Sequence, residues 1–364
     1  MKKIALYAGS FDPITCGHLN IVRRALDMFD EVVIAIGINH EKKGMFTVEE
    51  RMQLIYDAVG KNEPAFGRCL IRTFDGLAAD YAKVIGAKYL IKGARTTQDF
   101  DYERLINDVS LTQQCDLETV LLFSDHRLSH VSSSAVKTLA KHAGIVKDMV
   151  TPNVRRALDV KNGRRIVGVT GTIGSGKSTL CRRLVYHYQT AHYINLDEIA
   201  RSLFDRTDAL GTSVRDDVLK TFGTVDRKEL GAIVFGDKPK LMQLNDLYRT
   251  PMLTCLRLEL SKYRDDNVIF LEGALLFEFG WEFLCSTGKM IVVKTPDTYS
   301  HVERLRDRGH TDEQIARRIS SQLTMEEKLE LGMSALHKNE LTSIILYDTQ
   351  KTDSFDTLIG ELKL

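Results

Sequence analysis

The sequence has few of the features that would tie a chain to an oxidising compartment, a membrane or a polyanion. Its six cysteines are scattered and form no C-x-x-C pair, which excludes a dense disulfide framework and a zinc site of paired cysteines. No apolar run approaches the roughly 18 residues of a membrane-spanning helix. The formal net charge is only +1, so bulk charge does not favour a nucleic-acid or membrane-surface partner. We therefore expect a cytoplasmic protein with no nucleic-acid partner and no membrane attachment.

What is present is an ordinary globular composition. Hydrophobic residues make up 43% and charged residues 27% of the 364 residues, and this length predicts about two domains. The apolar run that follows Met1, Lys2 and Lys3 ends at Ser10, which is too early for a secretory leader. We interpret this run as a first strand.

Apolar runs alternate with amphipathic stretches along the chain, a pattern typical of α/β proteins with parallel sheets. Strands are expected at residues 4–8, 31–38, 69–74, 89–92, 119–123, 166–170, 192–195, 268–271, 289–294 and 343–346. Helices are expected at residues 18–28, 47–59, 77–85, 100–113, 133–142 and 179–188. A polar, turn-prone segment at 161–165 predicts a short linker between an N-terminal domain (1–160) and a C-terminal domain (165–364).

Two loops that follow strands carry the strongest motifs. Residues 9–18 read Gly-Ser-Phe-Asp-Pro-Ile-Thr-Cys-Gly-His. Residues 171–178 read Gly-Thr-Ile-Gly-Ser-Gly-Lys-Ser, the G-x-x-x-x-G-K-S pattern of a phosphate-binding loop. A loop between a strand and a helix directs backbone N–H groups and the positive end of the helix toward an anion. Two phosphate sites on one chain point to two consecutive reactions.

The first loop has the residues of a nucleotide site. Gly9 would let a phosphate approach the backbone, and Gly17 would turn the chain so that His18 faces the same pocket. Thr15, Gly17 and His18 fit the T/H-x-G-H signature of nucleotidylyltransferases. Further runs stand at 42–51 (Lys-Lys-Gly-Met-Phe-Thr-Val-Glu-Glu-Arg), 76–77 (Gly-Leu), 92–95 (Lys-Gly-Ala-Arg), 99–103 (Asp-Phe-Asp-Tyr-Glu) and 131–137 (Val-Ser-Ser-Ser-Ala-Val-Lys). With these runs, residues 1–158 resemble phosphopantetheine adenylyltransferases.

This resemblance implies a Rossmann-like nucleotidylyltransferase domain with a parallel sheet. It would transfer an adenylyl group from ATP to 4′-phosphopantetheine with Mg²⁺, giving dephospho-CoA and pyrophosphate. The phosphate nucleophile needs positioning and neutralisation of charge rather than a base, and we expect His18, Lys42 and Arg95 to be the catalytic donors. The implied ATP contacts are Ser10, Phe11, His18, Gly93, Ala94, Arg95, Glu103, Ser132, Ser133 and Ser134. The implied phosphopantetheine contacts are Ser10, Lys42, Leu77 and Lys92.

Each of these assignments has a plainer alternative. His18 could merely cap a helix. Lys42 and Lys43 could be a solvated pair in a loop. The run from Arg95 through Asp99 to Glu103 could form a ladder of surface ion pairs at i,i+4 spacing.

The second loop has a direct mechanism of nucleotide binding. Its backbone N–H groups would cradle phosphates, Lys177 would reach the β- and γ-phosphates, and the Ser178 hydroxyl would hold Mg²⁺. The expected ATP-binding residues are Gly171, Thr172, Ile173, Gly174, Ser175, Gly176, Lys177, Ser178 and Thr179. The loop alone does not identify the acceptor of the phosphoryl group.

The acceptor is indicated by runs further along the chain. Asn-Leu-Asp-Glu-Ile-Ala-Arg at 195–201, Asp-Arg-Lys-Glu-Leu at 226–230 and Leu-Leu-Phe-Glu at 275–278 resemble dephospho-CoA kinases. The resemblance, which covers about 165–330, implies a P-loop kinase α/β domain with a helical lid. It implies that Asp197 is the base for a ribose 3′-hydroxyl. The implied lid residues are Arg304, Arg306 and Arg308, with 314–319 and Gln322; a solvated basic helix is the plainer alternative.

The C-terminal half also departs from the pattern of this family. The first acid of its D-x-D is Asn195, its usual second loop glycine is Thr172, the histidine of its H-P pair is Thr250, and the proline before L-L-F-E is Ala274. The family's A-D-x-V-I-x-N tail is hard to recognise at 343–349. Because Lys177, Ser178 and Asp197 are present, we expect an active kinase.

Together the halves predict a bifunctional enzyme of the last two steps of coenzyme A synthesis. The product of the first reaction would be the acceptor of the second, so the substrates are 4′-phosphopantetheine, ATP and dephospho-CoA, with Mg²⁺ as cofactor. Assembly into a homo-oligomer through the N-terminal domain is compatible with this prediction. One alternative is a degenerate kinase domain that senses a ligand or acts as a scaffold. The other is a nicotinamide mononucleotide adenylyltransferase fused to a ribosylnicotinamide kinase.

Overall fold

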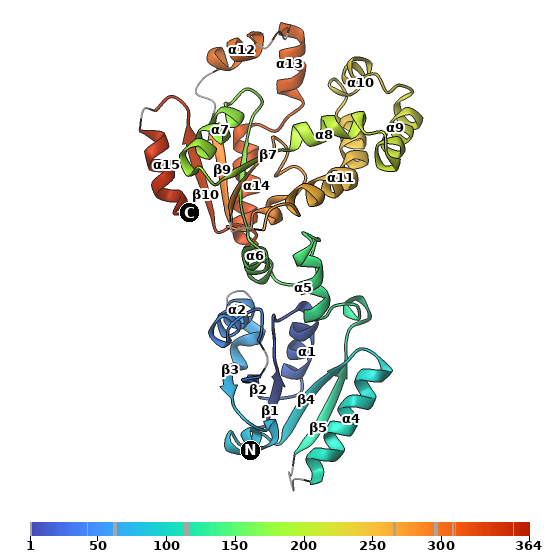
Figure 1. Ribbon diagram of the computed structural model, residues 1–364, viewed down its shortest axis with the longest axis vertical. Helices are drawn as coiled ribbons and strands as arrows, with labels where there is room; N and C mark the ends of the chain where they lie inside the picture. Colours follow the sequence, from blue (N-terminus) through green and yellow to red (C-terminus); the bar gives the residue numbers. More distant parts are fainter. Residues whose placement is uncertain are drawn as a thin grey trace. The chain divides into compact units, whose positions relative to one another are not determined.

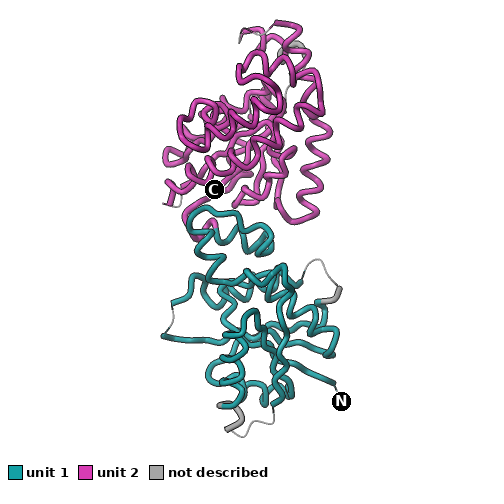
Figure 2. Tube along the Cα trace, turned by 90° about the vertical axis from the view of Figure 1, so that its right-hand side faces the viewer, with its two compact units in different colours: residues 1–158 teal, residues 159–364 magenta. Residues whose placement is uncertain are grey.

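The structure is a computed structural model that describes residues 2–41, 43–60, 64–112, 117–264, 267–294, 298–307, 309, 311–351 and 353–364. The chain divides into two compact units, unit 1 over Met1–Leu158 and unit 2 over Asp159–Leu364 (Figure 2). Each unit contains a five-stranded parallel sheet of its own, so both are α/β folds (Figure 1).

Unit 1 alternates strands and helices from its start. Its strands are β1 (Ile4–Gly9), β2 (Glu31–Gly37), β3 (Cys69–Phe74), β4 (Tyr89–Ala94) and β5 (Glu118–Phe123). Its helices are α1 (Cys16–Leu26), α2 (Val48–Gly60), α3 (Ala78–Val84), α4 (Thr97–Thr112), α5 (Ser133–Lys141) and α6 (Pro152–Lys161), the last of which runs into unit 2. The sheet order β3-β2-β1-β4-β5 reverses between β1 and β4. Open α/β sheets bind ligands at the carboxyl ends of the strands beside such a reversal.

Alternate residues of the unit 1 strands are buried on opposite faces of the sheet. Tyr7 and Ile34 belong to a core formed with α1 and α2, whereas Leu6 and Val33 pack against Ala82 of α3. A strand that is buried on both faces has a nearly continuous run of apolar residues, which is why β1 and β2 could be predicted from the sequence.

Unit 2 has the sheet order β10-β9-β6-β8-β7. Its strands are β6 (Arg164–Gly171), β7 (His192–Asn195), β8 (Asn267–Glu272), β9 (Lys289–Lys294) and β10 (Ser343–Asp348). The flanking helices are α7 (Lys177–Tyr188), α14 (Met325–His337) and α15 (Ser354–Leu362), and the lid helices are α12 (Thr298–Arg306) and α13 (Asp312–Ser320). Leu184 of α7 and Leu358 of α15 share a core with Val167 and Phe270 of the sheet.

Four consecutive helices separate β7 from β8, so the expectation that strands and helices alternate throughout the chain is wrong here. They are α8 (Leu196–Asp205), α9 (Ala209–Phe222), α10 (Arg227–Val234) and α11 (Lys238–Leu260). Val214, Val218, Leu230 and Val234 form a small core among these helices. Because the helices bury their apolar side chains against one another, they need no strand between them.

The segment expected to be a linker is a tight turn. α6 ends at Lys161 and β6 already begins at Arg164. Gly163 has φ 74°, and a Cβ at this position would lie 2.2 Å from the carbonyl oxygen of Arg264. Only glycine accepts this conformation and this close approach at no cost, which explains why the turn follows the helix directly.

The ten expected strands are all present, with ends within two residues of the predicted ones. α1 begins at Cys16 rather than at residue 18 because Thr15 caps it. Thr47 and Glu50 form a capping box at the start of α2, since Thr47 N–H donates to Glu50 at 2.8 Å and Glu50 N–H to Thr47 Oγ1 at 3.2 Å. None of the helices in the described part of the chain is long and apolar enough for a membrane span.

Candidate active sites

The first site lies where β1 runs into α1. The hydroxyl of Thr15 accepts the backbone N–H of His18 at 3.4 Å, and the backbone N–H of Thr15 donates to Nδ1 of His18 at 3.0 Å. This reciprocal capping box fixes the imidazole on the first turn of the helix. His18 therefore takes part in a cap, as the plainer alternative expects, but the cap uses only Nδ1.

The cap also determines the tautomer of His18. Because Nδ1 accepts a hydrogen bond from a backbone N–H, the ring proton lies on Nε2. Burial, with a smaller contribution from the Arg95 cation, lowers the pKa of His18 to about 4. The imidazole is consequently neutral near pH 7, and it can donate a hydrogen bond from Nε2.

We expect this depressed pKa to make unit 1 less stable in mild acid. An unfolded histidine has a pKa near 6.5, so below that value the unfolded chain binds more protons at this residue than the folded chain does. The free energy of unfolding should fall by about 2 kcal/mol between pH 7 and pH 5 on this account, and continue to fall until about pH 4. Replacing His18 with asparagine, whose Oδ1 can still accept from Thr15, should remove this part of the pH dependence.

Hydrogen exchange of β1 and β2 amides across a urea titration measures the stability of unit 1 separately from that of unit 2. An equal loss of stability in the wild-type chain and the His18→Asn variant would contradict the prediction.

Asp12 is a buried acid that the analysis of the sequence did not single out as functional. Its carboxylate accepts the backbone N–H groups of Met45 and Phe46 at 3.0 and 2.9 Å, and it pairs with Lys137 of α5 at 2.8 Å. Burial opposes its ionisation, but the bonds from Lys137 and the two N–H groups outweigh burial and lower its pKa. Asp12 thereby joins the 43–46 segment and α5 to the first loop.

Arg95 reaches the carboxyl edge of the sheet from the end of β4. Its guanidinium donates to the carbonyl oxygen of Val131 at 2.9 Å, next to the start of α5, and lies 3.5 Å from Asp99. Glu103 does not continue a ladder with Asp99. It pairs instead with Lys92 of β4 at 2.9 Å. The two residues expected to contact different substrates, Lys92 and Glu103, thus contact each other.

The other expected site residues of unit 1 differ in their solvent exposure. Ser10, Leu77 and Ser134 are exposed, whereas Ala94 is fully buried, and the buried Phe11 ring meets the imidazole of His18 edge to face with the ring centroids 5.2 Å apart. The hydroxyl of Ser132 caps α5, and that of Ser133 donates to the carbonyl oxygen of Pro13 at 2.8 Å. Gly93 follows Lys92 on β4. Lys42 lies outside the described residues.

The second site begins with the phosphate loop between β6 and α7. Gly171 and Gly176 have φ values of 147° and 99°, which favour glycine. Thr172 stands where the family usually has a second glycine. Its φ is not positive, so the backbone of this loop does not require glycine at this position. Lys177 is buried, and its ammonium donates to the carbonyl oxygens of Gly171 and Thr172 at 3.2 and 2.8 Å.

Glu272 is an acid of the second site that the analysis of the sequence missed. It ends β8, the neighbour of β6, and its side chain is buried. The Ser178 hydroxyl donates to its Oε1 at 2.9 Å, and the Tyr193 hydroxyl donates to its Oε2. The available signal was a single acid at the end of an apolar strand, which is too common a pattern to assign from sequence.

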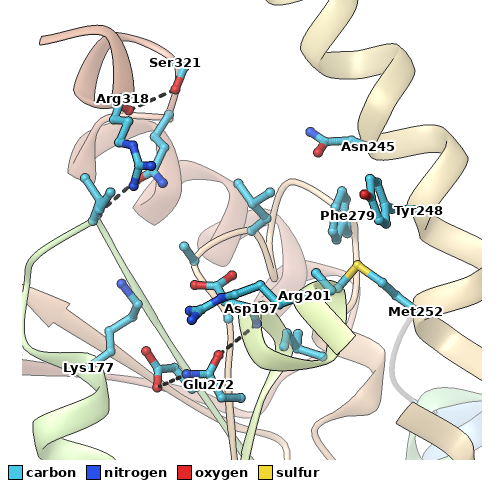
Figure 3. A pocket seen from close by; sticks show the side chains of 18 of the residues that line it. Lys177, Asp197, Arg201, Asn245, Tyr248, Met252, Glu272, Phe279, Arg318 and Ser321 are labelled. Carbon is cyan, nitrogen blue, oxygen red and sulfur yellow. Dashed lines mark hydrogen bonds between the residues drawn. The ribbon is translucent and has the colours of Figure 1, made fainter. Parts of the chain in front are cut away.

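A cavity of about 430 Å³ lies over the carboxyl ends of these strands. Figure 3 shows the polar groups Lys177, Asp197 and Glu272 on one side of it and the apolar side chains Tyr248 and Met252 on the other. Loop residues that line the cavity are Ile173, Gly174, Gly176, Lys177 and Ser178. The expected residues Gly171, Thr172, Ser175 and Thr179 do not line it. The cavity therefore has a polar end, formed by the phosphate loop and two acids, and an apolar end.

The lid contributes to this cavity through α13. Arg318 of α13 and Gln322, which follows the helix, line the cavity, and the Gln322 side chain accepts the backbone N–H of Ile173 at 2.9 Å. Nη1 of Arg304 lies 3.5 Å from the carbonyl oxygen of Ser175, on the loop itself. Arg306 forms an ion pair with Asp312 at 2.7 Å, an interaction within the lid. Arg308 lies outside the described residues.

The family departures in unit 2 have local explanations. The carbonyl oxygen of Ala274, where the family has proline, accepts the buried Lys328 ammonium at 2.7 Å, and Lys328 also pairs with Glu278. These hydrogen bonds fix the 274–278 segment, a function that the rigid ring of proline would have in the family. Thr250 is exposed on α11 and does not line the cavity. Residues 343–348 of the tail form β10 and pair with β9.

Comparisons with known proteins agree with this division of the chain. Residues 165–343 match the family model of dephospho-CoA kinase, and residues 6–139 match a cytidylyltransferase-like model. A phosphopantetheine adenylyltransferase of Geotalea daltonii is 40% identical over 162 residues, which are 44% of this chain and 98% of that protein. One of Leptospira biflexa is 41% identical over 158 residues, 43% of this chain and 96% of the other. The match to a structure of NadR protein in complex with NAD and AMP-PNP covers 100% of this chain and 97% of that protein, at 13% identity and with a TM-score of 0.34.

The fold and the two sites define a nucleotidylyltransferase domain followed by a P-loop kinase domain. The chain belongs to the phosphopantetheine adenylyltransferase family through its N-terminal half, and its C-terminal half matches the family model of dephospho-CoA kinase. The nicotinamide mononucleotide alternative is not favoured, because the relatives at about 40% identity are phosphopantetheine adenylyltransferases.

Proposed function

We propose that this chain catalyses the last two steps of coenzyme A formation, with ATP as co-substrate of both. Unit 1 would transfer AMP from ATP to 4′-phosphopantetheine and release pyrophosphate. Unit 2 would transfer the γ-phosphoryl group of a second ATP to the ribose 3′-hydroxyl of dephospho-CoA. The observation that carries the proposal is that Lys177, Ser178 and Asp197 line one cavity in a chain whose other half is of the adenylyltransferase family. The functional domains would be 1–160 and 165–364.

In unit 1 the proposed work is positioning and neutralisation of charge. The phosphate nucleophile is largely ionised at neutral pH, so the site needs no base. Nε2–H of His18 and the guanidinium of Arg95 would donate to the α-phosphate as its charge grows, and Lys42 is proposed to assist them. The backbone N–H groups and the Ser134 hydroxyl at the start of α5 suit the departing pyrophosphate.

In unit 2 the 3′-hydroxyl must lose a proton, and Asp197 is the proposed base. Lys177 would neutralise the β- and γ-phosphates, and Arg304 and Arg318 would do so from the lid. Ser178 and Glu272 fit Mg²⁺, because a hydroxyl and a carboxylate within 2.9 Å are the hard oxygen ligands that this ion prefers, and it needs few of them from protein. When bound by these residues, Mg²⁺ would supply positive charge that offsets the negative charge of the phosphates.

The alternative of a degenerate kinase domain is not favoured. Thr250 and Thr172 do not line the cavity, and Ala274 is held by Lys328. We further propose a cytoplasmic enzyme, with a homo-oligomer through the N-terminal domain as its assembly.

A chromatographic product assay on the full chain with 4′-phosphopantetheine, ATP and Mg²⁺ tests the proposal. We expect coenzyme A to appear after a transient rise of dephospho-CoA. Accumulation of dephospho-CoA alone would overturn the assignment of unit 2 and support the degenerate alternative. Turnover of nicotinamide mononucleotide in place of phosphopantetheine would overturn the assignment of unit 1.

A further inference from the structure

The register of the unit 2 sheet brings Asn195 and Glu272 together. Asn195 ends β7 and is the direct partner of Glu272, which ends β8. Partners in adjacent parallel strands point to the same face, and Tyr193, two residues before Asn195, points there too. Ser178 on the first turn of α7 approaches the same face and bonds to Glu272. Three side chains from β7 and β8 thus meet the start of α7.

Both edges of the Asn195 amide are used. Its Oδ1 accepts the backbone N–H groups of Asp197 and Glu198 at 2.8 and 3.3 Å, which makes Asn195 the N-cap of α8. Its Nδ2 donates to the Tyr193 hydroxyl at 3.0 Å and approaches Oε2 of Glu272 at 3.4 Å. The orientation of the amide follows from its partners, because only an oxygen can accept two N–H groups.

A carboxylate could perform only half of this function. Aspartate caps a helix as well as asparagine does, so an acid at position 195 would keep the bonds to α8. It could not donate to Glu272, however, and it would bring a second negative charge next to a buried carboxylate that is only 3% exposed. Ser178, Tyr193 and Asn195 donate hydrogen bonds to Glu272, and all three are neutral. Like charges so close in a buried site are costly.

We propose that Asn195 is a positioning residue of the kinase site, whose amide links the Glu272 carboxylate to the backbone of Asp197. Through this link Glu272, which bonds to Ser178, and Asp197, the proposed base, belong to one hydrogen-bond network. The departure from D-x-D is on this view an adaptation to Tyr193 and Glu272 and not a sign of decay. The inference rests on the proposed function of unit 2, which assigns Asp197 as the base.

The decisive variant is Asn195→Asp in the full chain, because it preserves the size and the cap and changes only the donor and the charge. With dephospho-CoA and ATP supplied directly, we expect kcat of the kinase reaction to fall at least tenfold while the KM for dephospho-CoA stays within about twofold. If Asn195 served only as a cap, this variant would behave like the wild type. Adenylyl transfer in the same preparation is the internal control and should not change.

Stability provides a second readout that does not depend on activity. Trp281 is the only tryptophan of the chain and is buried in unit 2, so its fluorescence follows the melting of this unit. Asn195→Asp should lower the melting temperature by roughly 3 °C or more, and adding Glu272→Gln should restore it by reversing donor and acceptor. An unchanged kcat or an unchanged melting temperature in Asn195→Asp would overturn the inference. A wild-type chain that does not phosphorylate dephospho-CoA would overturn the proposed function instead, and the melting experiment would still test the link.

Discussion

Replacing His18 with alanine is expected to slow dephospho-CoA formation by about 10²–10³-fold, the usual cost of losing one preorganised donor to a developing anion. The imidazole is suited to this task because its Nδ1 is occupied by the backbone N–H of Thr15, which leaves Nε2–H free to donate. Its orientation is set before substrate arrives, so no free energy is needed to order it during the reaction.

The low pKa of His18 adds a testable detail to this expectation. Because that pKa is about 4, the ring keeps one proton between pH 6 and pH 9 and should contribute no ionisation to the rate profile in this range. His18→Gln, whose amide can place an N–H near the position of Nε2, should recover part of the rate. Phosphorylation of added dephospho-CoA by unit 2 of the same variant is the control for folding.

The Thr15→Val variant distinguishes the contribution of the Thr15 hydroxyl from that of the Thr15 backbone N–H. The valine keeps the N–H that bonds to Nδ1 and loses the hydroxyl that lies 3.0 Å from the same nitrogen. We expect a fall in rate of less than about tenfold, because the bond that selects the tautomer remains.

The proposed role of His18 would be contradicted if His18→Ala retained a rate within threefold of the wild type.

Most strands of the two sheets could be predicted from sequence because they contain apolar runs that end at a turn, whereas β7 is short and leads directly into α8. The capping residues were predictable for a similar reason, since Thr47 and Glu50 lie three residues apart and interact locally. The helices α8–α11 were not delimited, because they pack on one another and show no alternation with strands. Local patterns were therefore sufficient wherever the interaction itself was local.

The residues missed at the two sites all depend on contacts between distant parts of the chain. Asp12 bonds to a segment 33 residues away, and Glu272 bonds to Ser178 across 94 residues. Likewise the pair between Lys92 of β4 and Glu103 of α4 follows from packing rather than from helical spacing. A motif indicates that a residue type is available, but which side chains pair is decided by the register and the layers of the fold.

The Asn195 substitution shows how such contacts change the interpretation of a motif. In the sequence it is a lost carboxylate and counts against an active kinase. In the structure its amide bonds to Tyr193 and to the N–H of Asp197, and it faces Glu272. The base of the proposed reaction is therefore held by its backbone, and its carboxylate is left to face the cavity.

Replacing Asp197 with alanine is accordingly expected to slow the kinase reaction by about 10²–10⁴-fold, the range for loss of a general base. Asp197 lines the cavity on the first turn of α8, and its side chain is exposed to the space where the acceptor would lie. Dephospho-CoA should then accumulate from 4′-phosphopantetheine at the wild-type rate of the first step, because unit 1 is untouched.

Two further variants identify the function that is lost. Asp197→Asn preserves the size of the side chain but cannot take up a proton, so it should be nearly as slow as the alanine variant. Glu198→Ala is the matched control, since Glu198 is the neighbouring acid on the same turn and does not line the cavity. Its rate should stay within twofold of the wild type. Full activity in Asp197→Asn would transfer the role of base to another group, and Glu272 is the other acid among the described residues that line the cavity.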